Sequence, residues 1–270
     1  MKRYRLLAWL FVLTALFLAN SCMVIDTVDN WEIYFNFEPG VTMKWRYTFR
    51  TDGPVATLRH GEITMTHVGY ENRRGYECMK FKVTECSGDV SCDTGYYWYS
   101  NSDDALRFVD VTGQAMSPIF RNVDDSYQFV INGRRIVGLD ELERYVSGIA
   151  FFGVPMSPED GLEEVQQTLK YPLEIGKEWV VFRHPWLRTR RVVGEETITV
   201  PAGTFNTLKL ETRDPDYADF RIYHWITGEA WVKVLVVFRT ALYDENGNFL
   251  GYATVSETYE LQEISWSQEP

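Results

Sequence analysis

The residues best suited to acid–base chemistry lie in the last quarter of the chain. His224 stands in an alternating, strand-like segment, and Asp214, Asp216 and Asp219 precede it closely. Carboxylates beside a histidine could hold calcium or act as general acid and base. Because Asp-Pro-Asp is also a common turn sequence, the turn interpretation is favoured. The sequence has no H-E-x-x-H, G-x-S-x-G or glycine-rich phosphate motif, so we expect no catalytic residues, no metal and no cofactor.

A short basic run is the second feature that could bind a ligand. Arg188, Arg190 and Arg191 follow one another closely in an otherwise acidic protein. Such a run could bind an anion, but charged side chains also keep the exposed edge strand of a sheet from pairing with another chain. We expect the second role, with these arginines on a solvated strand edge.

Three cysteines in the body of the chain suggest disulfide or metal chemistry. Cys86 and Cys92 flank a short loop, and in an exported protein this spacing predicts a hairpin disulfide. A metal site that includes Cys78 is disfavoured, because the close C-x-x-C spacing of zinc sites is missing. Cys78 would then be a free thiol. It shares strand parity with Lys80 and Lys82, so we expect it near the polar face and open to oxidation.

The first residues predict export and attachment to a membrane. Basic residues at positions 2, 3 and 5 precede an apolar run over residues 6–18, which is long enough for a signal peptide and short for a membrane span. Small residues then lead to Cys22. This pattern resembles the lipobox of bacterial lipoproteins, in which the thiol is acylated, although Ala19 stands where that family usually has a large aliphatic residue. The alternatives are an ordinary cleaved signal peptide and a signal anchor.

Acylation of Cys22 would make residues 1–21 the signal peptide and residues 22–30 a short tether. Several acyl chains hold a protein firmly on a bilayer, where a single chain does not. Met23 follows the cysteine in place of an aspartate, and by resemblance to enterobacterial sorting this favours the outer membrane, facing the periplasm or the surface. No second run of about 20 apolar residues follows, so we expect a body that lies outside the bilayer.

The composition is that of an acidic, aromatic-rich globular chain. Its 270 residues carry a formal charge of -11. Residues 1–21 hold three basic and no acidic residues, so the remainder carries three more negative charges than the whole. This charge argues against a nucleic-acid partner and against electrostatic docking on anionic lipids. Aromatic residues make up 15% of the chain, which favours strands. The composition predicts no oligomeric state.

Period-two alternation predicts a first β-unit over residues 31–113. Its clearest segment is residues 43–50, in which every second side chain from Met43 to Phe49 is apolar. Further strands are expected at residues 31–37, 62–68, 76–85, 95–100 and 105–111, with turn-forming residues between several of them.

A second β-unit is predicted over residues 171–266, and its sequence resembles the first. The matched positions are Trp45 with Trp179, Gly61 with Gly194, residues 64–66 with 197–199, residues 79–81 with 208–210, and Tyr96 and Trp98 with Tyr223 and Trp225. The slips in this alignment fall in turns, which favours a duplicated unit of four or five strands. The alternative is that β-meanders share a generic alternation.

One corner of the second unit has a local mechanism. Pro201 cannot donate a backbone hydrogen bond and Gly203 tolerates a positive φ, so the two predict a tight structural turn between strands. This V-P-A-G-T-F sequence, with P-L-x-x-G-x-x-W at residues 172–179 and G-x-x-x-V-K at residues 228–233, resembles a broad group of uncharacterised β-rich bacterial envelope proteins, many of them lipoproteins. The resemblance implies a strongly curved antiparallel sheet or half-barrel, akin to lipoprotein carriers, and implies no catalytic residues.

Residues 114–170 break the alternation and predict a partly helical insert between the two units. Short helices are expected at residues 139–146 and 158–169, the second with Pro158 near its start and acidic residues in its early turns. In a curved sheet such an insert usually fills the open mouth or lies across the concave face. A packed connector is favoured over a mobile lid.

These features together predict a mainly β protein, in which two similar antiparallel β-units form a curved sheet or half-barrel with a small helical insert between them. We expect a membrane-anchored envelope lipoprotein without catalytic activity, held to the bilayer through acylated Cys22. Its curved sheet would bind an apolar ligand or an envelope protein. The alternative is an envelope hydrolase that uses His224 and the aspartates before it.

Overall fold

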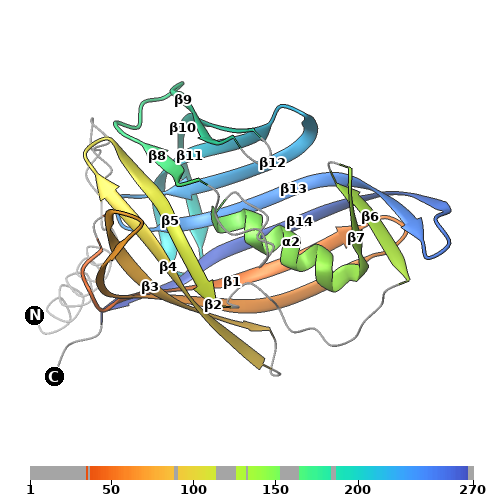
Figure 1. Ribbon diagram of the computed structural model, residues 1–270, viewed down its shortest axis with the longest axis horizontal. Helices are drawn as coiled ribbons and strands as arrows, with labels where there is room; N and C mark the ends of the chain where they lie inside the picture. Colours follow the sequence, from red (N-terminus) through yellow and green to blue (C-terminus); the bar gives the residue numbers. More distant parts are fainter. Residues whose placement is uncertain are drawn as a thin grey trace, which may run out of the picture. The chain divides into compact units, whose positions relative to one another are not determined.

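The computed structural model describes residues 35, 37–87, 91–113, 126–131, 133–152, 164–183 and 187–266. These residues belong to one unit, Glu32–Pro270, and form strands and one helix, α2 Gly138–Phe152 (Figure 1). The strands are β1 Val41–Asp52, β2 Thr57–Arg73, β3 Tyr76–Ser87, β4 Ser91–Ser102, β5 Ala105–Gly113, β6 Tyr127–Ile131, β7 Arg134–Val137, β8 Gln166–Lys170, β9 Glu178–Phe182, β10 Arg188–Val200, β11 Gly203–Asp214, β12 Tyr217–Ile226, β13 Trp231–Asp244 and β14 Phe249–Trp266. The predicted signal peptide, the tether and Cys22 lie outside the described residues.

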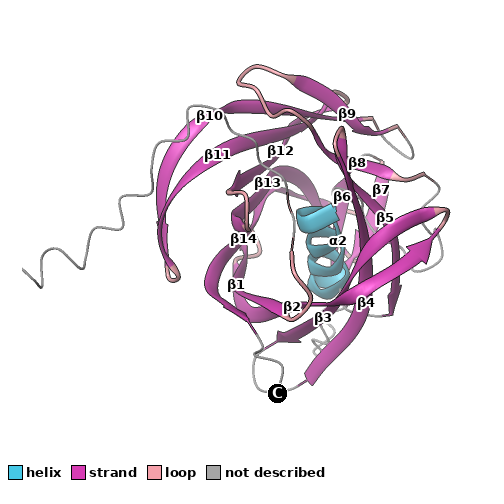
Figure 2. Ribbon diagram, turned by 90° about the vertical axis from the view of Figure 1, so that its left-hand side faces the viewer, coloured by secondary structure: helices cyan, strands magenta, loops and turns pink. Residues whose placement is uncertain are grey.

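All these strands belong to one antiparallel sheet that curls on itself. The hydrogen-bonded order is β8-β5-β4-β3-β2-β1-β14-β13-β12-β11-β10-β9, and the hairpin β6–β7 adds to β13. Figure 2 shows the strands curving around an interior that contains α2. The two ends of the order, β8 and β9, are connected by Trp179, whose Nε1 donates to the Gln167 carbonyl oxygen over 3.0 Å. The predicted fold class, a curved half-barrel of two similar antiparallel units with a helical insert, is confirmed.

Alternation in β1 decides which of its side chains face the interior. Met43, Trp45, Tyr47 and Phe49 are completely buried, and the residues between them are half-buried or exposed, as the period-two pattern predicts. β1 is a central strand, paired with β14 on one side and β2 on the other. Burial of each large apolar side chain is worth roughly 1.5–3 kcal/mol, and a slip of one residue would expose the whole row. The row therefore fixes the register of the central strand.

The two units share one arrangement across three neighbouring strands. In each unit a bulge in the first strand precedes a glycine, the glycine pairs with a lysine of the second strand, and the lysine pairs with a tryptophan of the third. These sets are Gly69, Lys80 and Trp98 in β2–β3–β4, and Gly194, Lys209 and Trp225 in β10–β11–β12.

The observed register agrees with the predicted match of residues 79–81 with 208–210. It differs from the predicted match for the preceding strands, β2 and β10. Gly194 corresponds to Gly69 and not to Gly61, a shift of eight residues along the strand. Alternation repeats every two residues, so the pattern alone does not fix how far two strands are shifted, whereas a bulge does. By the same register Trp179, opposite Arg190, corresponds to Met43 and not to Trp45.

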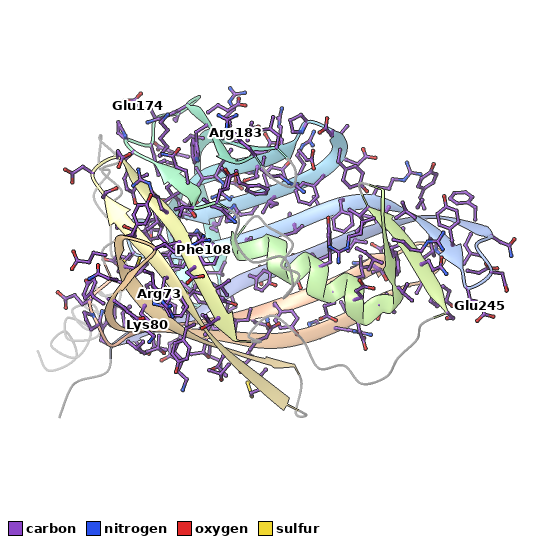
Figure 3. The ribbon with its side chains drawn as sticks, viewed as in Figure 1. Arg73, Lys80, Phe108, Glu174, Arg183 and Glu245 are labelled. Carbon is purple, nitrogen blue, oxygen red and sulfur yellow. A yellow bond between two sulfur atoms is a disulfide. The ribbon has the colours of Figure 1, made fainter. Side chains whose placement is uncertain are left out.

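Side chains on the outer surface repeat the same arrangement. Lys80 Nζ lies 2.9 Å from a Glu71 carboxylate oxygen and 4.8 Å from the ring centroid of Tyr96. Lys209 Nζ lies 2.9 Å from a Glu196 carboxylate oxygen and 4.8 Å from the ring centroid of Trp225. Each lysine therefore stands between a carboxylate and an aromatic face. Figure 3 labels Lys80 beside Arg73, the residue that covers Trp98 in the first unit.

Aromatic rings fill the interior near the start of β1. Phe35 stacks on Trp231 with ring centroids 4.6 Å apart, and Phe37 meets the edge of Phe81 at 5.7 Å. Asn101 Nδ2 donates to the Phe35 carbonyl oxygen over 2.7 Å and holds this segment in place. Aromatic pairs of this kind are worth about 0.5–1.5 kcal/mol beyond their buried area. The strand predicted at residues 31–37 is wrong at its two described residues, because Phe35 and Phe37 pack as rings outside any ladder.

The insert between the units is only partly as predicted. The helix expected at residues 139–146 is confirmed within the longer α2, and it lies inside the curve of the sheet (Figure 2). The helix expected at residues 158–169 is wrong from Gln166 onward, because these residues form β8 and pair with β5. The hairpin β6–β7 was not predicted, although its turn carries Gly133 at a φ of 76° after an asparagine. In the described part of the chain, no helix is long and apolar enough to cross a membrane.

Candidate functional site

α2 is the element that carries ionisable side chains into the interior. It begins at Gly138, whose φ of 79° lets the chain turn directly from β7 into the helix. The Val137 amide donates to a Glu141 carboxylate oxygen over 2.8 Å, which closes the first turn. Leu142 and Val146 are one turn apart and completely buried. α2 packs against β13, β14, β6 and β7, so its apolar stripe and its acidic first turn both face the sheet.

Arg59 of β2 binds two carboxylates of α2, and we call Arg59, Asp140 and Glu143 the Arg59 triad. Arg59 Nη1 lies 2.7 Å from Asp140 Oδ1 and 2.7 Å from Glu143 Oε2. The Glu143 side chain is completely buried, and the other two are mostly buried. Charge-assisted hydrogen bonds are short and roughly twice as strong as neutral ones. The triad therefore ties the first two turns of the helix to one strand.

Glu143 is the titratable centre of the Arg59 triad. Burial, with a smaller contribution from the nearby charge of Asp140, raises the pKa of the Glu143 carboxyl to about 7. Hydrogen bonding and the positive charge of Arg59 act against this rise, as does the hydroxyl group of Tyr47. Because the ordinary pKa of a glutamate lies far lower, Glu143 changes charge near neutral pH, where a glutamate with the ordinary pKa is ionised.

Tyr47 lies next to the triad, and carboxyl groups from two further strands lie near Tyr47. Tyr47 comes from β1, Glu85 from β3 and Glu257 from β14, and all three side chains are buried. Burial raises the pKa of Tyr47 far above its ordinary value, and the negative charges of Glu85, Glu143 and Glu257 add to the rise. Tyr47 therefore stays a neutral hydroxyl group, and this part of the interior is rich in carboxyl groups.

A second buried ion pair lies in the other β-unit. Arg188 Nη2 of β10 lies 3.2 Å from Asp214 Oδ2 of β11, and both side chains are completely buried. The Arg188 guanidinium also lies 3.8 Å from the ring centroid of Phe220. Tyr145 of α2 is close enough that the positive charge of Arg188 lowers its pKa, against the larger effect of burial. α2 thus has an ionic group near it in each β-unit.

Arg190 connects three strands from inside the sheet. Its Nε donates to Thr212 Oγ1 over 2.8 Å, and its Nη1 donates to the Thr168 carbonyl oxygen of β8 over 2.8 Å. Burial lowers the pKa of Arg190 to about 10, so the group remains charged at neutral pH. Together with Trp179, Arg190 holds the β8 end of the sheet close to the β9 end.

The expectation that the arginine run lies on a solvated edge is therefore wrong for two of its members. β10 pairs with both β9 and β11, so it is not an edge strand. Arg188 and Arg190 point inward, whereas Arg191 is exposed. The alternation of the strand could have indicated this. Arg188 and Arg190 lie an even number of residues from the apolar Val192, which places all three on one face.

The residues on which the hydrolase alternative depends do not come together. His224 lies within β12, opposite Leu210, and is buried. Asp214 belongs to the ion pair with Arg188, and the Asp216 amide donates to its carboxylate over 2.9 Å, as turn chemistry predicts. Asp219 is exposed and five residues before His224, which is roughly 17 Å along a strand. The arrangement provides no shared acid–base site.

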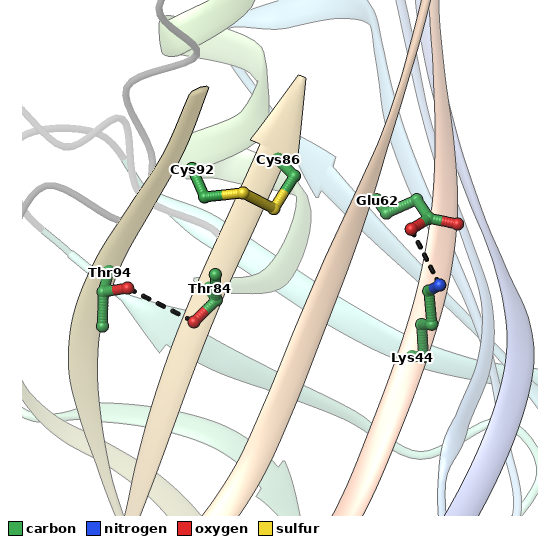
Figure 4. Close-up of a disulfide and its surroundings, with 6 residues drawn as sticks. All are labelled: Lys44, Glu62, Thr84, Cys86, Cys92 and Thr94. Carbon is green, nitrogen blue, oxygen red and sulfur yellow. Dashed lines mark hydrogen bonds and ion pairs between the residues drawn. A yellow bond between two sulfur atoms is a disulfide. The ribbon is translucent and has the colours of Figure 1, made fainter. Parts of the chain in front are cut away.

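Cys86 and Cys92 face each other across the β3–β4 ladder and are joined by a disulfide (Figure 4). Their Cα atoms are 4.2 Å apart. Thr84 and Thr94, the next outward-facing pair along the ladder, hydrogen-bond through their hydroxyl groups at 3.3 Å. These cross-strand contacts fasten the β3–β4 hairpin next to the loop that joins its strands.

Cys78 is completely buried, and the expectation of an oxidisable thiol near the polar face is wrong. Its strand parity is as predicted, but the outer surface of β3 is covered there by Trp98 and Val109. Burial raises the pKa of the Cys78 thiol to about 11, which keeps it protonated. Among the described residues no group of three or more His, Cys, Asp or Glu side chains is placed to hold a metal ion.

Pro201 and Gly203 lie at the turn between β10 and β11. Gly203 has a φ of 138° and pairs with Val200, the last residue of β10. The Ala202 amide between them donates to the Leu261 carbonyl oxygen of β14 over 3.0 Å. The turn thus links β10 and β11 to β14, the strand that pairs with β1.

Comparison with known proteins adds little to this geometry. No family model matches the sequence, and no curated protein matches it. A candidate exported protein of Bacteroides fragilis with a YmcC-like fold aligns over 86% of this chain and 99% of its own, with 10% identity and a TM-score of 0.30. A candidate lipoprotein of Parabacteroides distasonis aligns over 86% of this chain and 98% of its own, with 13% identity and a TM-score of 0.28. These values are too low for either protein to bear on function here.

Sequence reasoning did not single out the Arg59 triad. Arg59 lies on the same face of β2 as the buried Ile63 and Met65. A charged residue on an apolar strand face was therefore the one feature of the sequence that could have pointed to it. Glu143 follows Leu142 and precedes Tyr145 in the helix, and no pattern within the helix marks it as buried. Its role becomes visible only once the helix is placed inside the sheet.

Proposed function

We propose that this chain is a lipid-anchored envelope protein whose curved sheet binds the apolar body of a ligand on its concave face, without catalysis. The anchor rests on the basic N-terminus, the apolar run over residues 6–18 and Cys22. The binding role rests on one observation: α2, which belongs to neither β-unit, lies inside the curve of the sheet and is held there partly by ion pairs.

The surface beneath α2 has the composition of a site for an amphiphile. α2 contacts β13 and β14 among other strands, and the inward-facing side chains of these two strands are mostly apolar. They include Val234, Val236, Phe238, Leu242, Ala253 and Val255. Glu257, close to Tyr47, interrupts this apolar row on β14. Ligand sites of this kind are lined mainly by apolar groups, with a few polar groups that fix the orientation of the ligand. An amphiphile with a long apolar part fits this surface.

The anchor would place the protein in the bacterial envelope. We infer attachment to the outer membrane through acylated Cys22, with the body facing the periplasm or the surface, because Met23 follows the cysteine. The P-L-x-x-G-x-x-W and V-P-A-G-T-F segments support kinship with the β-rich envelope lipoproteins that they resemble. We further infer that the two β-units arose by internal duplication, on the strength of the equivalent sets around Lys80 and Lys209.

Metabolic labelling with an alkyne fatty acid tests the anchor. The wild-type protein should incorporate the label, and Cys22→Ala should lose it while accumulating as a protein of the same fold. Label on Cys22→Ala, or none on the wild type, would overturn the lipid anchor.

Titration of the Cys22→Ala protein with dansyl-undecanoic acid tests the binding role. We expect a saturable rise in dansyl emission that unlabelled long-chain fatty acids reverse. Ile175→Glu, a change at an exposed residue, is the matched control and should bind as the parent does. A non-saturable signal would overturn the concave-face site and favour the alternative, an envelope protein as the partner.

A further inference from the structure

The Arg59 triad, which holds α2 over the sheet, contains a group that can titrate, the carboxyl group of Glu143. We propose that α2 is a hinged cover over the concave surface, held closed by the Arg59 triad, and that release of the proton on Glu143 opens it. The inference rests on the proposed binding role, because it states what controls access to that surface.

The geometry of the triad gives the reason for proton dependence. Asp140 and Glu143 approach the same nitrogen of Arg59, each at 2.7 Å, so their carboxyl groups are close to each other. Two carboxylates near one guanidinium repel each other when both are ionised, and burial penalises each charge. A proton on Glu143 removes that repulsion and leaves the Arg59–Asp140 pair intact. The closed helix is therefore favoured by the protonated form of Glu143.

The other groups that face this site do not remove the dependence. The hydroxyl group of Tyr47 from β1 acts to lower the pKa of Glu143, but burial outweighs this effect. Glu85 from β3 and Glu257 from β14 lie close enough for their negative charges to act on Tyr47. Glu85 and Glu257 therefore add negative charge around Tyr47, the neighbour of Glu143, and neither provides a positive charge that would oppose the effect of Asp140.

The helix also has a place about which it can turn. Gly138 joins β7 to α2 at a φ of 79°, in a region of backbone conformation that glycine enters without strain. Hinges are commonly single positions at the end of an element that absorb a change of φ and ψ. β7 is held in the sheet through β6, which pairs with β13, so the strand can stay while the helix moves.

The sign of the effect follows from proton linkage. The pKa of Glu143 is about 7 in the closed state, against 4.5 for the free group, so closing takes up a proton between these values. A group whose pKa is raised on closing stabilises the closed state in acid and loses this effect as pH rises through the closed-state pKa. Between pH 5.5 and pH 8 the opening equilibrium should shift on the order of 20-fold toward the open state.

Hydrogen exchange read by mass spectrometry on the full chain measures this shift. After correction for intrinsic exchange, α2 amides should lose protection on the order of 20-fold from pH 5.5 to pH 8, with a midpoint near 7, whereas β11 amides should not change. Glu143→Gln, which mimics the protonated form, should keep α2 protected at every pH. Glu245→Gln is the matched control, because it makes the same change at the tip of the β13–β14 hairpin (Figure 3).

If the protection of α2 amides in the wild type does not change with pH, the proposal that α2 is a hinged cover is wrong. This measurement does not depend on any variant folding. Retained pH dependence in Glu143→Gln would also overturn it. The two proposals fail separately. Saturable dansyl-undecanoic acid binding with a pH-independent α2 overturns the cover alone, whereas a titrating α2 without saturable binding overturns the binding role alone.

Discussion

The ring of Tyr47 occupies the space that a side chain on Gly61 would fill. The two residues are opposite each other in the β1–β2 ladder, and a Cβ on Gly61 would lie 2.3 Å from Tyr47 Cε1 and 2.6 Å from its hydroxyl oxygen. Glycine inside a strand often marks such a close approach. Here it allows a central strand to direct a hydroxyl group toward Glu143.

Gly61→Ala should therefore destabilise the fold by roughly 1–3 kcal/mol, because the Tyr47 ring is buried and has to shift. Urea unfolding followed by tryptophan fluorescence measures the change. Gly194→Ala is the control, since nothing lies within 4 Å of a Cβ there, and its effect should be about 0.5 kcal/mol or less. A Tyr47→Leu background should reduce the cost of Gly61→Ala; an equal cost in both backgrounds would contradict the explanation.

Breaking the Arg188–Asp214 ion pair should be far more costly than its contact distance suggests. Asp214→Asn leaves a buried guanidinium facing a neutral amide, and we expect a loss of about 3–5 kcal/mol in urea unfolding. Replacing both partners, as Arg188→Met with Asp214→Leu, should restore much of that loss. Arg213→Gln removes an exposed arginine from Glu211 on the same strand, and Glu211 keeps Arg221 as a partner, so this change should cost about 1 kcal/mol or less. Similar losses for Asp214→Asn and Arg213→Gln would argue against a buried pair.

Removal of the Cys86–Cys92 disulfide should lower stability by about 2 kcal/mol, because its closed loop is short and restricts the unfolded chain modestly. The double variant Cys86→Ser with Cys92→Ser and the wild type under dithiothreitol should give the same shift in urea midpoint. Different shifts would mean that the bond is absent in the purified protein or that the serines disturb the hairpin.

Cys78 should resist alkylation in the folded protein. Its pKa of about 11, against 9.0 for a free thiol, lowers the thiolate fraction at pH 8 about a hundredfold, and burial slows access further. Iodoacetamide labelling followed by mass spectrometry should therefore be at least about a hundredfold slower in buffer than in urea. Comparable rates in the two conditions would show that Trp98 and Val109 do not cover the thiol.

Local patterns in the sequence were enough for the central strands and not for the interior. The row from Met43 to Phe49 shows its buried face directly, because alternation and burial agree at every position. The pairing of Gly69 with Lys80 was missed, since a bulge resets the phase of the alternation. Gln166 to Leu169 became a strand because pairing with β5 outweighs a local preference for helix.

The charged interior was hidden for a different physical reason. Arg188 and Arg190 were expected at a solvated strand edge because charge keeps edge strands from pairing, although their parity with Val192 indicated the opposite. Glu143 and Arg59 are far apart in sequence, and only the placement of α2 inside the sheet brings them within 2.7 Å. An ion pair of this kind can be recognised only once the tertiary structure is known.

The ends of the strand order meet through side chains. Trp179 and Arg190 reach the backbone carbonyl oxygens of Gln167 and Thr168, while the ladder runs from β8 round to β9 through the other strands. Parting these ends would break these side-chain hydrogen bonds and the one from the Arg183 amide to a Glu164 carboxylate oxygen, and among the described residues it would break no ladder between β8 and β9. The circumference of the curved sheet can therefore change where β8 meets β9, and a bulky ligand could be accommodated without loss of pairing between any two strands.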